Sequence, residues 1–285
     1  MKLGIGTPVL TLLPRAHARW EETATFDDVI AIVQEAERLG YHHCTCSEHV
    51  AVPVDVAAVR GGRYFDPLAT FGALGHATAT IRFAAHVGVL GYHHPLAIAK
   101  RYGTLDVVTG GRVILGVGVG SLREEFDLLG APFDDRGARA DDAMRALRSA
   151  LSQPEPEYHG TYVDFEGFLV DPSAVQPHVP MWVGGRTFRS LRRAVELGDG
   201  WAPFGLRTAE LEEMLHRAGR PDRPFDVIVQ NEHPLDPLTE PDRVADQLRR
   251  FSGIGATGVN VRFVHHSRDH YCEQLAALAD VAASV

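Results

Sequence analysis

Short apolar segments alternate with longer amphipathic segments along the whole chain, and this alternation constrains the fold more than any other feature. Each apolar segment is typical of a buried strand, and each amphipathic segment has the periodicity of a surface helix. About eight such pairs follow one another, which predicts parallel β-α units. In 285 residues these units fit one α/β domain, a (β/α)8 TIM barrel over residues 1–285. A doubly wound open sheet is the alternative.

The residues at the expected element boundaries agree with this division. Gly40 follows a periodic run, and Pro95 and Pro241 stand where helices begin. The expected strands are 3–6, 41–46, 81–90, 113–116, 180–183, 199–202, 225–230 and 258–263. The expected helices are 26–39, 96–107, 135–151, 191–197, 209–218, 241–251 and 271–283.

Two segments, 48–67 and 131–180, are too long for minimal β-α units. The second has aromatic and valine residues around Gly160 and Gly167, which predicts a small hairpin within 158–170. Extra loops at the C-terminal ends of barrel strands build substrate pockets. We therefore expect both segments to be insertion loops at the C-terminal rim that shape the substrate site.

Composition excludes several classes of protein. The net charge is −9 at pH 7, whereas sequence-independent nucleic-acid binding needs clustered basic charge. The longest apolar runs fall far short of the about 20 residues of a membrane span, and the N-terminus lacks the features of an export signal. The odd cysteine count of three argues against a disulfide framework. We expect a cytoplasmic protein that acts on a small molecule, with neither nucleic acid nor membrane as a partner.

Glycines at alternate positions end one of the expected strands. Residues 112–126 read RVILGVGVGSLREEF, so Gly116, Gly118 and Gly120 lead from a strand into a charged segment that can begin a helix. Backbone N–H groups in such a turn can approach a phosphate because no Cβ obstructs them. The spacing differs from the G-x-G-x-x-G of dinucleotide-binding folds. The alternative is that these glycines only end a buried strand.

A second glycine pair follows the next expected strand. Gly184 and Gly185 precede Arg186, and two neighbouring strands that end in glycines can direct N–H groups at one phosphate. Arg186 would add charge-assisted hydrogen bonds. This repetition favours a phosphate-bearing ligand over two unrelated tight turns.

The segment YHHCTCSEH at 41–49 concentrates side chains that can bind metals. Successive side chains of a strand face opposite sides, so His43 points away from His42, and no further pair has the spacing of a zinc site. We therefore expect no metal. Glu48 and His49 fall where the second strand ends, at the rim where barrel enzymes carry catalytic residues. The alternative is an acid and a histidine of a surface loop.

Several motifs, taken in order, resemble the bacterial luciferase-like flavin and deazaflavin oxidoreductases, specifically the branch that uses coenzyme F-420. They are GIGTPV, SEHV, DPLATFGALGHATATIRFAAHVGVL, HHPLAIAKRYGTLDVVTGGRVILGVGVGSLREEF, RGARADDAMRALRSAL and VPMWVGGRTFRSLRRAVELGDGW. The resemblance extends over residues 1–201, and beyond it only the general pattern matches. It implies a homodimeric TIM barrel that binds its cofactor at the C-terminal rim.

The resemblance also implies roles for individual residues. A non-prolyl cis peptide under the deazaflavin ring would fall at Gly88-Val89. His49 corresponds to a rim histidine near the reactive ring carbon, and Glu48 to the acidic position before it. The residues implied for the phosphate end of the cofactor are Gly118, Gly120, Ser121, Gly184 and Gly185, with Arg186 beside them.

Two positions depart from the sugar-phosphate dehydrogenases of this family. Ser121 stands where they have an acid, and a tryptophan that follows their rim histidine is replaced near Pro53. We therefore do not expect glucose-6-phosphate oxidation. The first hypothesis is an F-420-dependent hydride transfer in which His49 moves a proton and the cofactor supplies the redox chemistry. The alternatives are an FMN-dependent monooxygenase that receives reduced flavin from a separate reductase, and a cofactor-binding barrel without turnover.

Overall fold

A closed parallel barrel forms the centre of the molecule. The computed structural model describes residues 1–14, 16–219 and 221–285 of the chain. In order around the barrel, the strands are β1 (Lys2–Gly6), β2 (His43–Cys46), β3 (Arg82–Ala85), β5 (Val113–Gly118), β8 (Met181–Gly184), β9 (Gly200–Ala202), β10 (Asp226–Gln230) and β11 (Gly258–Val261). The barrel closes because each strand pairs in parallel with the next and β11 pairs with β1. The short strand β4 (Gly88–Val89) continues β3 after a break and also pairs with β5.

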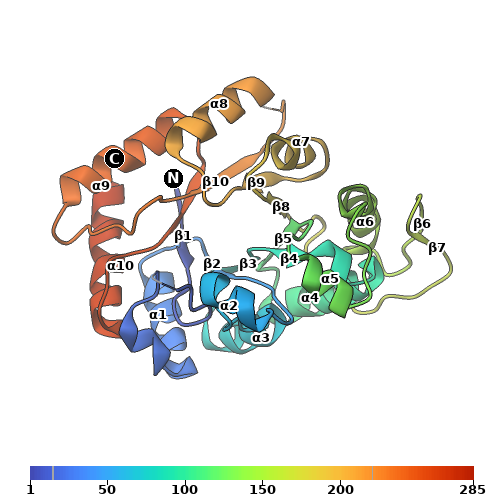
Figure 1. Ribbon diagram of the computed structural model, residues 1–285, viewed down its shortest axis with the longest axis horizontal. Coiled ribbons are helices and arrows are strands. Elements are labelled where there is room, and N and C mark those ends of the chain that lie inside the picture. The colour runs from blue at the N-terminus through green and yellow to red at the C-terminus, as the bar shows by residue number, and fades with distance from the viewer. Residues whose placement is uncertain (15, 220) are drawn as a thin grey trace.

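Helices surround the barrel, and each barrel strand is followed by one of them (Figure 1). The principal helices are α1 (Phe26–Arg38), α3 (Pro67–Ala77), α4 (Pro95–Thr109), α6 (Arg136–Ala150), α7 (Phe188–Leu197), α8 (Thr208–Ala218), α9 (Pro241–Gly253) and α10 (Arg268–Ala283). Four shorter helical segments belong to the loops: η1 (Arg19–Glu22), α2 (Val54–Arg60), η2 (Leu90–Tyr92) and α5 (Arg123–Leu128). The sequence prediction of a TIM barrel is thus confirmed, and the open-sheet alternative is wrong because the sheet has closed on itself.

Inward-facing side chains fill the barrel below its mouth. The His43 ring packs edge-on against Trp182, with 5.0 Å between the ring centroids, and His43 Nε2 donates to Asn260 Oδ1 at 2.6 Å. Gly4 leaves the necessary room, since a Cβ there would lie 2.2 Å from His43 Nε2. Burial lowers the pKa of His43 to about 3. His43 is therefore a neutral residue of the barrel core.

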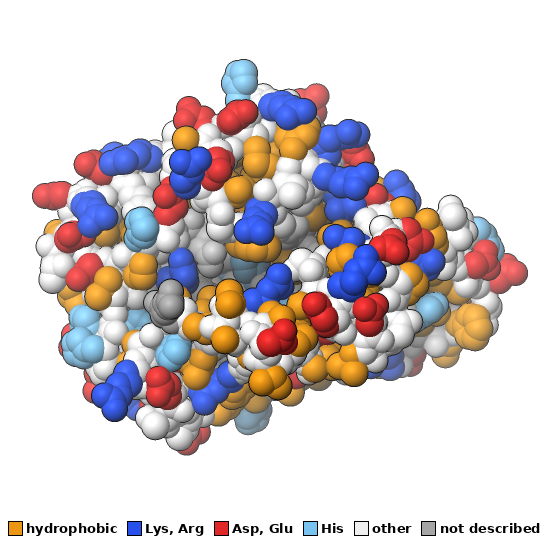
Figure 2. Space-filling view, in the orientation of Figure 1, with side chains coloured by type: hydrophobic (Ala, Val, Ile, Leu, Met, Phe, Trp, Pro, Cys, Tyr) orange, Lys and Arg blue, Asp and Glu red, His pale blue; other side chains and the backbone are white. Residues whose placement is uncertain are grey.

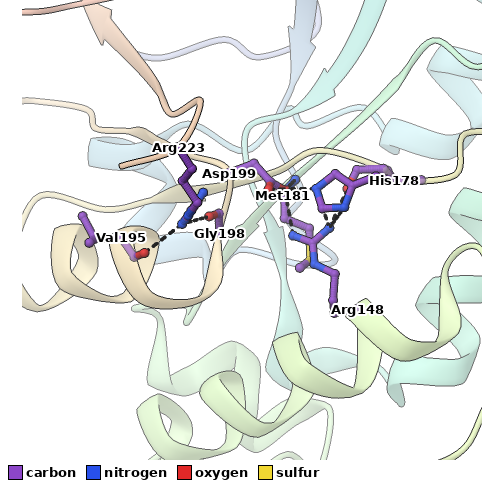
Figure 3. A network of polar contacts seen from close by, with 8 residues as sticks. Arg148, His178, Met181, Val195, Gly198, Asp199 and Arg223 are labelled. Atoms are coloured by element: carbon purple, nitrogen blue, oxygen red, sulfur yellow. Dashed lines mark hydrogen bonds and ion pairs between the residues drawn. The ribbon is translucent and has the colours of Figure 1, made fainter. Parts of the chain in front are cut away.

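A polar network joins the opposite, N-terminal ends of two strands (Figure 3). Asp199 precedes β9, and its Oδ2 accepts from the Met181 amide at 2.8 Å and from Arg148 Nη2 at 2.7 Å. Its Oδ1 accepts from His178 Nε2 at 2.8 Å. The carboxylate thus ties α6 and the start of β8 to the start of β9, and its role is structural.

The two long insertions take different positions. Segment 48–67 forms α2 above the end of β2, at the C-terminal rim as expected. Segment 131–180 contains α6 and then the antiparallel hairpin of β6 (Tyr158–His159) and β7 (Asp164–Phe165), which projects at the right of Figure 1. The hairpin packs on the outer face of α6, where Tyr158 Oη donates to Asp142 Oδ1 at 2.6 Å.

The hairpin also reaches segments that follow two of the barrel strands. Tyr162 makes a hydrogen bond with the Asp135 side chain, which stands between β5 and α6, and the Phe165 ring lies 6.4 Å from the ring of His94 at the start of α4. A role of the hairpin in shaping the substrate pocket stays a prediction.

Two further properties follow from the described residues. Cys44, Cys46 and Cys272 are free thiols. Among the described helices none combines the length and the apolar character that crossing a membrane requires.

Candidate functional site

The C-terminal ends of the barrel strands surround a mouth. Figure 2 shows it as a hollow near the middle of the molecule, with Lys and Arg side chains at its border. The C-terminal ends of β2, β3, β5 and β8 and the segments that follow them carry every site residue expected from the sequence. These four strands are neighbours in the barrel. The structure therefore brings the expected residues to one side of the mouth.

His49 is paired with Glu125, a residue that the sequence did not single out. His49 Nδ1 lies 2.7 Å from Glu125 Oε2. The pKa of Glu125 is lowered, so this carboxylate accepts and His49 Nδ1–H donates. Nε2 of His49 makes no hydrogen bond with any described residue, and the His49 side chain keeps 19% exposure whereas that of Glu125 has 0%. The pair thus fixes the imidazole ring and leaves Nε2 for a ligand.

Glu125 stands at the centre of a small hydrogen-bonded cluster. Its Oε1 accepts from the amides of Val50 at 2.6 Å and Ala51 at 3.2 Å, and its Oε2 also accepts from Tyr92 Oη at 2.6 Å. Burial alone would raise the pKa of Glu125, but the hydrogen bonds from Tyr92, His49 and Ala51 outweigh it and lower the pKa. A buried ionised carboxylate therefore holds the whole rim segment that carries His49.

Glu48 has a different environment from its neighbour in sequence. Its Oε2 accepts from the Val89 amide at 2.6 Å, and its Oε1 accepts from His93 Nε2 at 2.8 Å. Its side chain lines a small internal cavity together with Leu68 of α3 and Tyr102 of α4. Glu48 and His49 thus diverge, and Glu48 fastens the segment after β3.

The break between β3 and β4 contains a non-prolyl cis peptide bond at His86-Val87. The prediction had placed it two residues later, at Gly88-Val89, which instead form β4 and pair with β5. The glycine was a poor guide, because a Cβ at Gly88 would make only ordinary contacts at 3.6 Å.

Val87, beside the cis bond, explains two of the glycines in the predicted cofactor site. A Cβ at Gly118 would lie 2.6 Å from Val87 Cγ2, and one at Gly184 would lie 2.5 Å from Val87 Cγ1. Both glycines thus make room for one valine side chain in the barrel. Their assignment to a phosphate stays a prediction, with packing as a demonstrated second reason for their identity.

The second glycine of each strand end, Gly120 or Gly185, lies farther out on the rim. Gly120 and Gly185 have positive φ values of 74° and 121°, which L side chains rarely adopt. Ser121 is exposed and its Oγ accepts from Arg60 Nη1 of α2 at 3.1 Å. Arg186 is exposed and has no partner among the described residues. This part of the rim therefore carries two cations, a hydroxyl and two glycine turns.

The potential metal ligands of the described residues gather elsewhere. Glu157, His159 and Glu166 lie within reach of one another on the exposed hairpin, away from the barrel mouth. In the 41–49 segment, His42 and His43 instead bond to each other, with 2.9 Å between their Nδ1 atoms.

Comparison with known proteins identifies relatives of this chain. The family model described as luciferase-like monooxygenase matches residues 7–252. Uncharacterized protein Rv0940c of Mycobacterium tuberculosis is 30% identical over 261 residues, which cover 85% of this chain and 87% of that protein.

Two further similarities bear on the cofactor. The oxygenase component of the flavin-dependent trigonelline monooxygenase of Acinetobacter baylyi is 25% identical over 208 residues, 71% of this chain and 56% of that protein. The structure of the coenzyme F-420-dependent tetrahydromethanopterin reductase of Methanopyrus kandleri superposes with a TM-score of 0.74 at 17% identity, over 98% of this chain and 97% of that one. The second similarity shows a shared fold.

Proposed function

Because the chain belongs to the luciferase-like monooxygenase family, we propose that it is an oxidoreductase that uses coenzyme F-420 and transfers hydride between this cofactor and a small organic substrate. The observation that carries the proposal is the His49–Glu125 pair, an oriented imidazole with a free Nε2 at the mouth of the barrel. The resemblance of the sequence motifs to the F-420 branch supports this cofactor over a flavin.

The residues of the rim fit the phosphate end of such a cofactor. Gly120 and Gly185 adopt positive φ, which turns the backbone without a side chain in the way. Ser121 offers a hydroxyl, and Arg60 and Arg186 offer guanidinium groups without a carboxylate partner among the described residues. Gly118 and Gly184 lie deeper, beside the Val87 side chain, and in this proposal they let the backbone of the two strand ends approach the cofactor from below.

The deazaflavin, when bound, supplies the redox chemistry as a two-electron hydride carrier. The protein must then handle the proton that accompanies hydride transfer to or from a carbonyl, an alcohol or an activated double bond. We assign this proton to His49 Nε2. Glu125 favours a proton on Nδ1 and stabilises the imidazolium that forms when Nε2 takes up a proton.

Glu48 and Tyr92 act through other residues. Glu48 holds the Val89 amide and His93, and thereby the position of the segment that contains Val87. Tyr92 donates to Glu125 and so orients the carboxylate toward His49. Both are positioning residues in this proposal.

Titration of the purified protein with coenzyme F-420 and, separately, with FMN tests the cofactor. We expect saturable binding of F-420, followed by its fluorescence, and weaker binding of FMN. Arg186→Gln should weaken F-420 binding, while Arg189→Gln, an exposed arginine of α7 with no hydrogen bond to a described residue, is the matched control. Equal affinity in both variants would remove Arg186 from the site, and binding of neither cofactor would overturn the proposal.

An FMN-dependent monooxygenase is the second candidate, favoured by the similarity to a flavin-dependent oxygenase component. Such an enzyme would need a separate reductase to supply reduced flavin. Tighter binding of FMN than of F-420, with oxygen consumption only when a flavin reductase is added, would establish this alternative. Cofactor binding without turnover across a broad substrate panel would instead indicate a binding protein.

We also propose that the protein is a homodimer, as the sequence resemblance implies. Light scattering coupled to size exclusion measures this directly, since one chain has a mass of 31.1 kDa. A single species at the monomer mass across the concentration range would contradict the proposal.

A further inference from the structure

Arg262 carries a charge inside the barrel mouth that no acidic group balances. It follows β11, and its Cγ lies 3.4 Å from the position that a Cβ on Gly6 would occupy. Gly6 shares the inward face of β1 with Gly4, whose missing Cβ faces His43 and Asn260 in the barrel interior. The stem of Arg262 therefore runs along the inner wall of the barrel, at the level of the mouth.

The guanidinium has few partners. Its Nη2 donates to two backbone carbonyls, Asn231 O at 3.3 Å and Glu232 O at 3.5 Å. Its Nε is buried and has no hydrogen-bond partner, and its Nη1 makes no hydrogen bond with a described residue. No ion pair of the described residues includes Arg262, whereas Arg193 of α7 and Arg148 of α6 each face a carboxylate.

The electrostatic setting agrees with this geometry. Burial lowers the pKa of Arg262, and no nearby acidic group acts against it. By contrast, Asp106 and Asp226 counteract the effect of burial on Arg82. A desolvated cation is costly unless an anion pairs with it. Arg262 is thus a cation prepared for an anionic partner that the chain itself does not provide.

The backbone of Arg262 is held rigidly. The buried Asn231 side chain accepts from the Arg262 amide at 3.0 Å through Oδ1 and donates to the Arg262 carbonyl at 3.1 Å through Nδ2. These bonds fix the backbone from which the Arg262 side chain extends, while the guanidinium itself is held only by its two Nη2 hydrogen bonds. A fixed starting point reduces the conformational freedom that the side chain loses when a ligand binds.

The position of Arg262 separates it from the phosphate end of the cofactor site. The rim segments with Ser121 and Arg186 follow β5 and β8, and these strands lie across the barrel from β1 and β11. His49 follows β2, which is the neighbour of β1. An anion at Arg262 therefore lies on the side of the mouth where the proposed proton transfer takes place.

We propose that Arg262 binds an anionic group of the substrate, a carboxylate or a phosphate, inside the barrel mouth. Only the identification of the bound anion as part of a substrate rests on the proposed function. The anion site itself is defined by residues of the chain. The planar guanidinium suits both groups because it can donate two parallel N–H bonds.

Ligand-observed NMR titrations of the full-length protein test the proposal. The probes are benzoate, phenyl phosphate and the neutral benzamide, each added to the wild type, Arg262→Gln and Arg189→Gln. We expect benzoate or phenyl phosphate to bind the wild type and Arg189→Gln equally, and Arg262→Gln at least about tenfold more weakly. Tighter binding of one probe than of the other identifies the carboxylate or the phosphate as the preferred group.

Several results would overturn the inference. These are binding of benzamide as tight as that of the anions, unchanged anion affinity in Arg262→Gln, or no anion binding by the wild type. Displacement of the bound anion by saturating FMN or F-420 would also overturn it, because the anion would then occupy the cofactor's own site. If Arg262→Gln does not fold, Arg262→Lys replaces it in the test. This variant keeps the positive charge but lacks the planar guanidinium that donates two parallel N–H bonds. An unchanged anion affinity in Arg262→Lys counts against the proposal.

The outcome is independent of the cofactor test. If neither F-420 nor FMN binds while benzoate binding still depends on Arg262, the proposed function fails and the anion site stands. If a cofactor binds and Arg262→Gln leaves the affinity for every anion unchanged, the proposed function stands and the anion site fails.

Discussion

Glu125 Oε2 lies 2.7 Å from His49 Nδ1, and this contact joins the start of α5 to the segment after β2. The same carboxylate accepts from two backbone amides of that segment. The position of the His49 ring and the nitrogen that carries its proton therefore depend on the buried Glu125, which is distant in the sequence.

The variant Glu125→Gln should separate two roles of Glu125, which are to position the His49 ring and to supply a negative charge beside it. In Glu125→Gln we expect turnover to fall about 10- to 100-fold with a smaller change in KM, because the carboxylate no longer stabilises a protonated imidazole. Steady-state kinetics against pH measure this, and a changed pH profile distinguishes it from a loss of folded protein. Glu124→Gln, an exposed neighbour, is the control. A profile in Glu125→Gln that matches the wild type would show that the pair has no part in proton transfer.

Tyr92 also donates a hydrogen bond to Glu125, and loss of the Tyr92 hydroxyl should shift the pH dependence of activity in one direction. Its hydrogen bond helps to lower the pKa of Glu125, so Tyr92→Phe raises that pKa toward its ordinary value. The acid limb of the activity profile should then move to higher pH, and the free energy of unfolding should fall by about 1.5–3 kcal/mol.

The matched control for this change is Tyr158→Phe, which removes a 2.6 Å hydrogen bond to Asp142 on the outer hairpin. It should lower stability and leave the pH profile in place. An unshifted acid limb in Tyr92→Phe would mean that Glu125 does not govern activity.

The fold could be predicted from the sequence because its signals are local. Strand and helix periodicities place most barrel elements to within a few residues; the expected strand 113–116, for example, extends to Gly118. The exceptions are α3 (Pro67–Ala77), which was not expected, and the expected strand 81–90, which is broken between β3 and β4. The helix α2 was missed because its exposed valines, among them Val54 at 92% exposure, give no amphipathic pattern.

The site could be predicted only in part, because its key contacts are between distant residues. His49 is recognisable at a strand end, whereas Glu125 belongs to a charged run with Glu124. The apolar Phe126 beside Glu125 is the one local signal that this face of α5 points inward. Arg60 and Tyr92 were missed for the same reason. The cis peptide bond was expected at a glycine, yet it lies at His86-Val87, since no residue type marks that position.

Gly184 should not tolerate a methyl group while Val87 keeps its side chain. The Cβ of Gly184→Ala would lie 2.5 Å from Val87 Cγ1, and such overpacking costs about 1–3 kcal/mol. Val87→Ala should recover much of this loss in the double variant, which a double-mutant cycle of unfolding free energies measures. Gly72→Ala is the control, since nothing lies within 4 Å of its added Cβ and alanine favours the helix. Strict additivity of the two changes would contradict the assigned contact.

Asp199 should control stability at acidic pH without affecting activity. Burial alone would raise its pKa, but the Met181 amide, Arg148 and His178 outweigh it and lower the pKa. A carboxyl group whose folded pKa is depressed stabilises the fold above its unfolded pKa of about 3.9, and this contribution is lost as pH falls through the folded value. Asp199→Asn should therefore be less stable than the wild type at pH 7, by about 1.5–3 kcal/mol.

The difference between Asp199→Asn and the wild type should narrow steadily below about pH 4, as measured by denaturant unfolding at a series of pH values. Asp164→Asn is the control, because its partner His159 is on the exposed hairpin, where an ion pair contributes about 0–1 kcal/mol. A gap that stays constant down to pH 2 would show that charge on Asp199 is not what stabilises the network. Turnover in both variants should equal that of the wild type, because Asp199 lies at the N-terminal ends of the strands and His49 at the C-terminal ends.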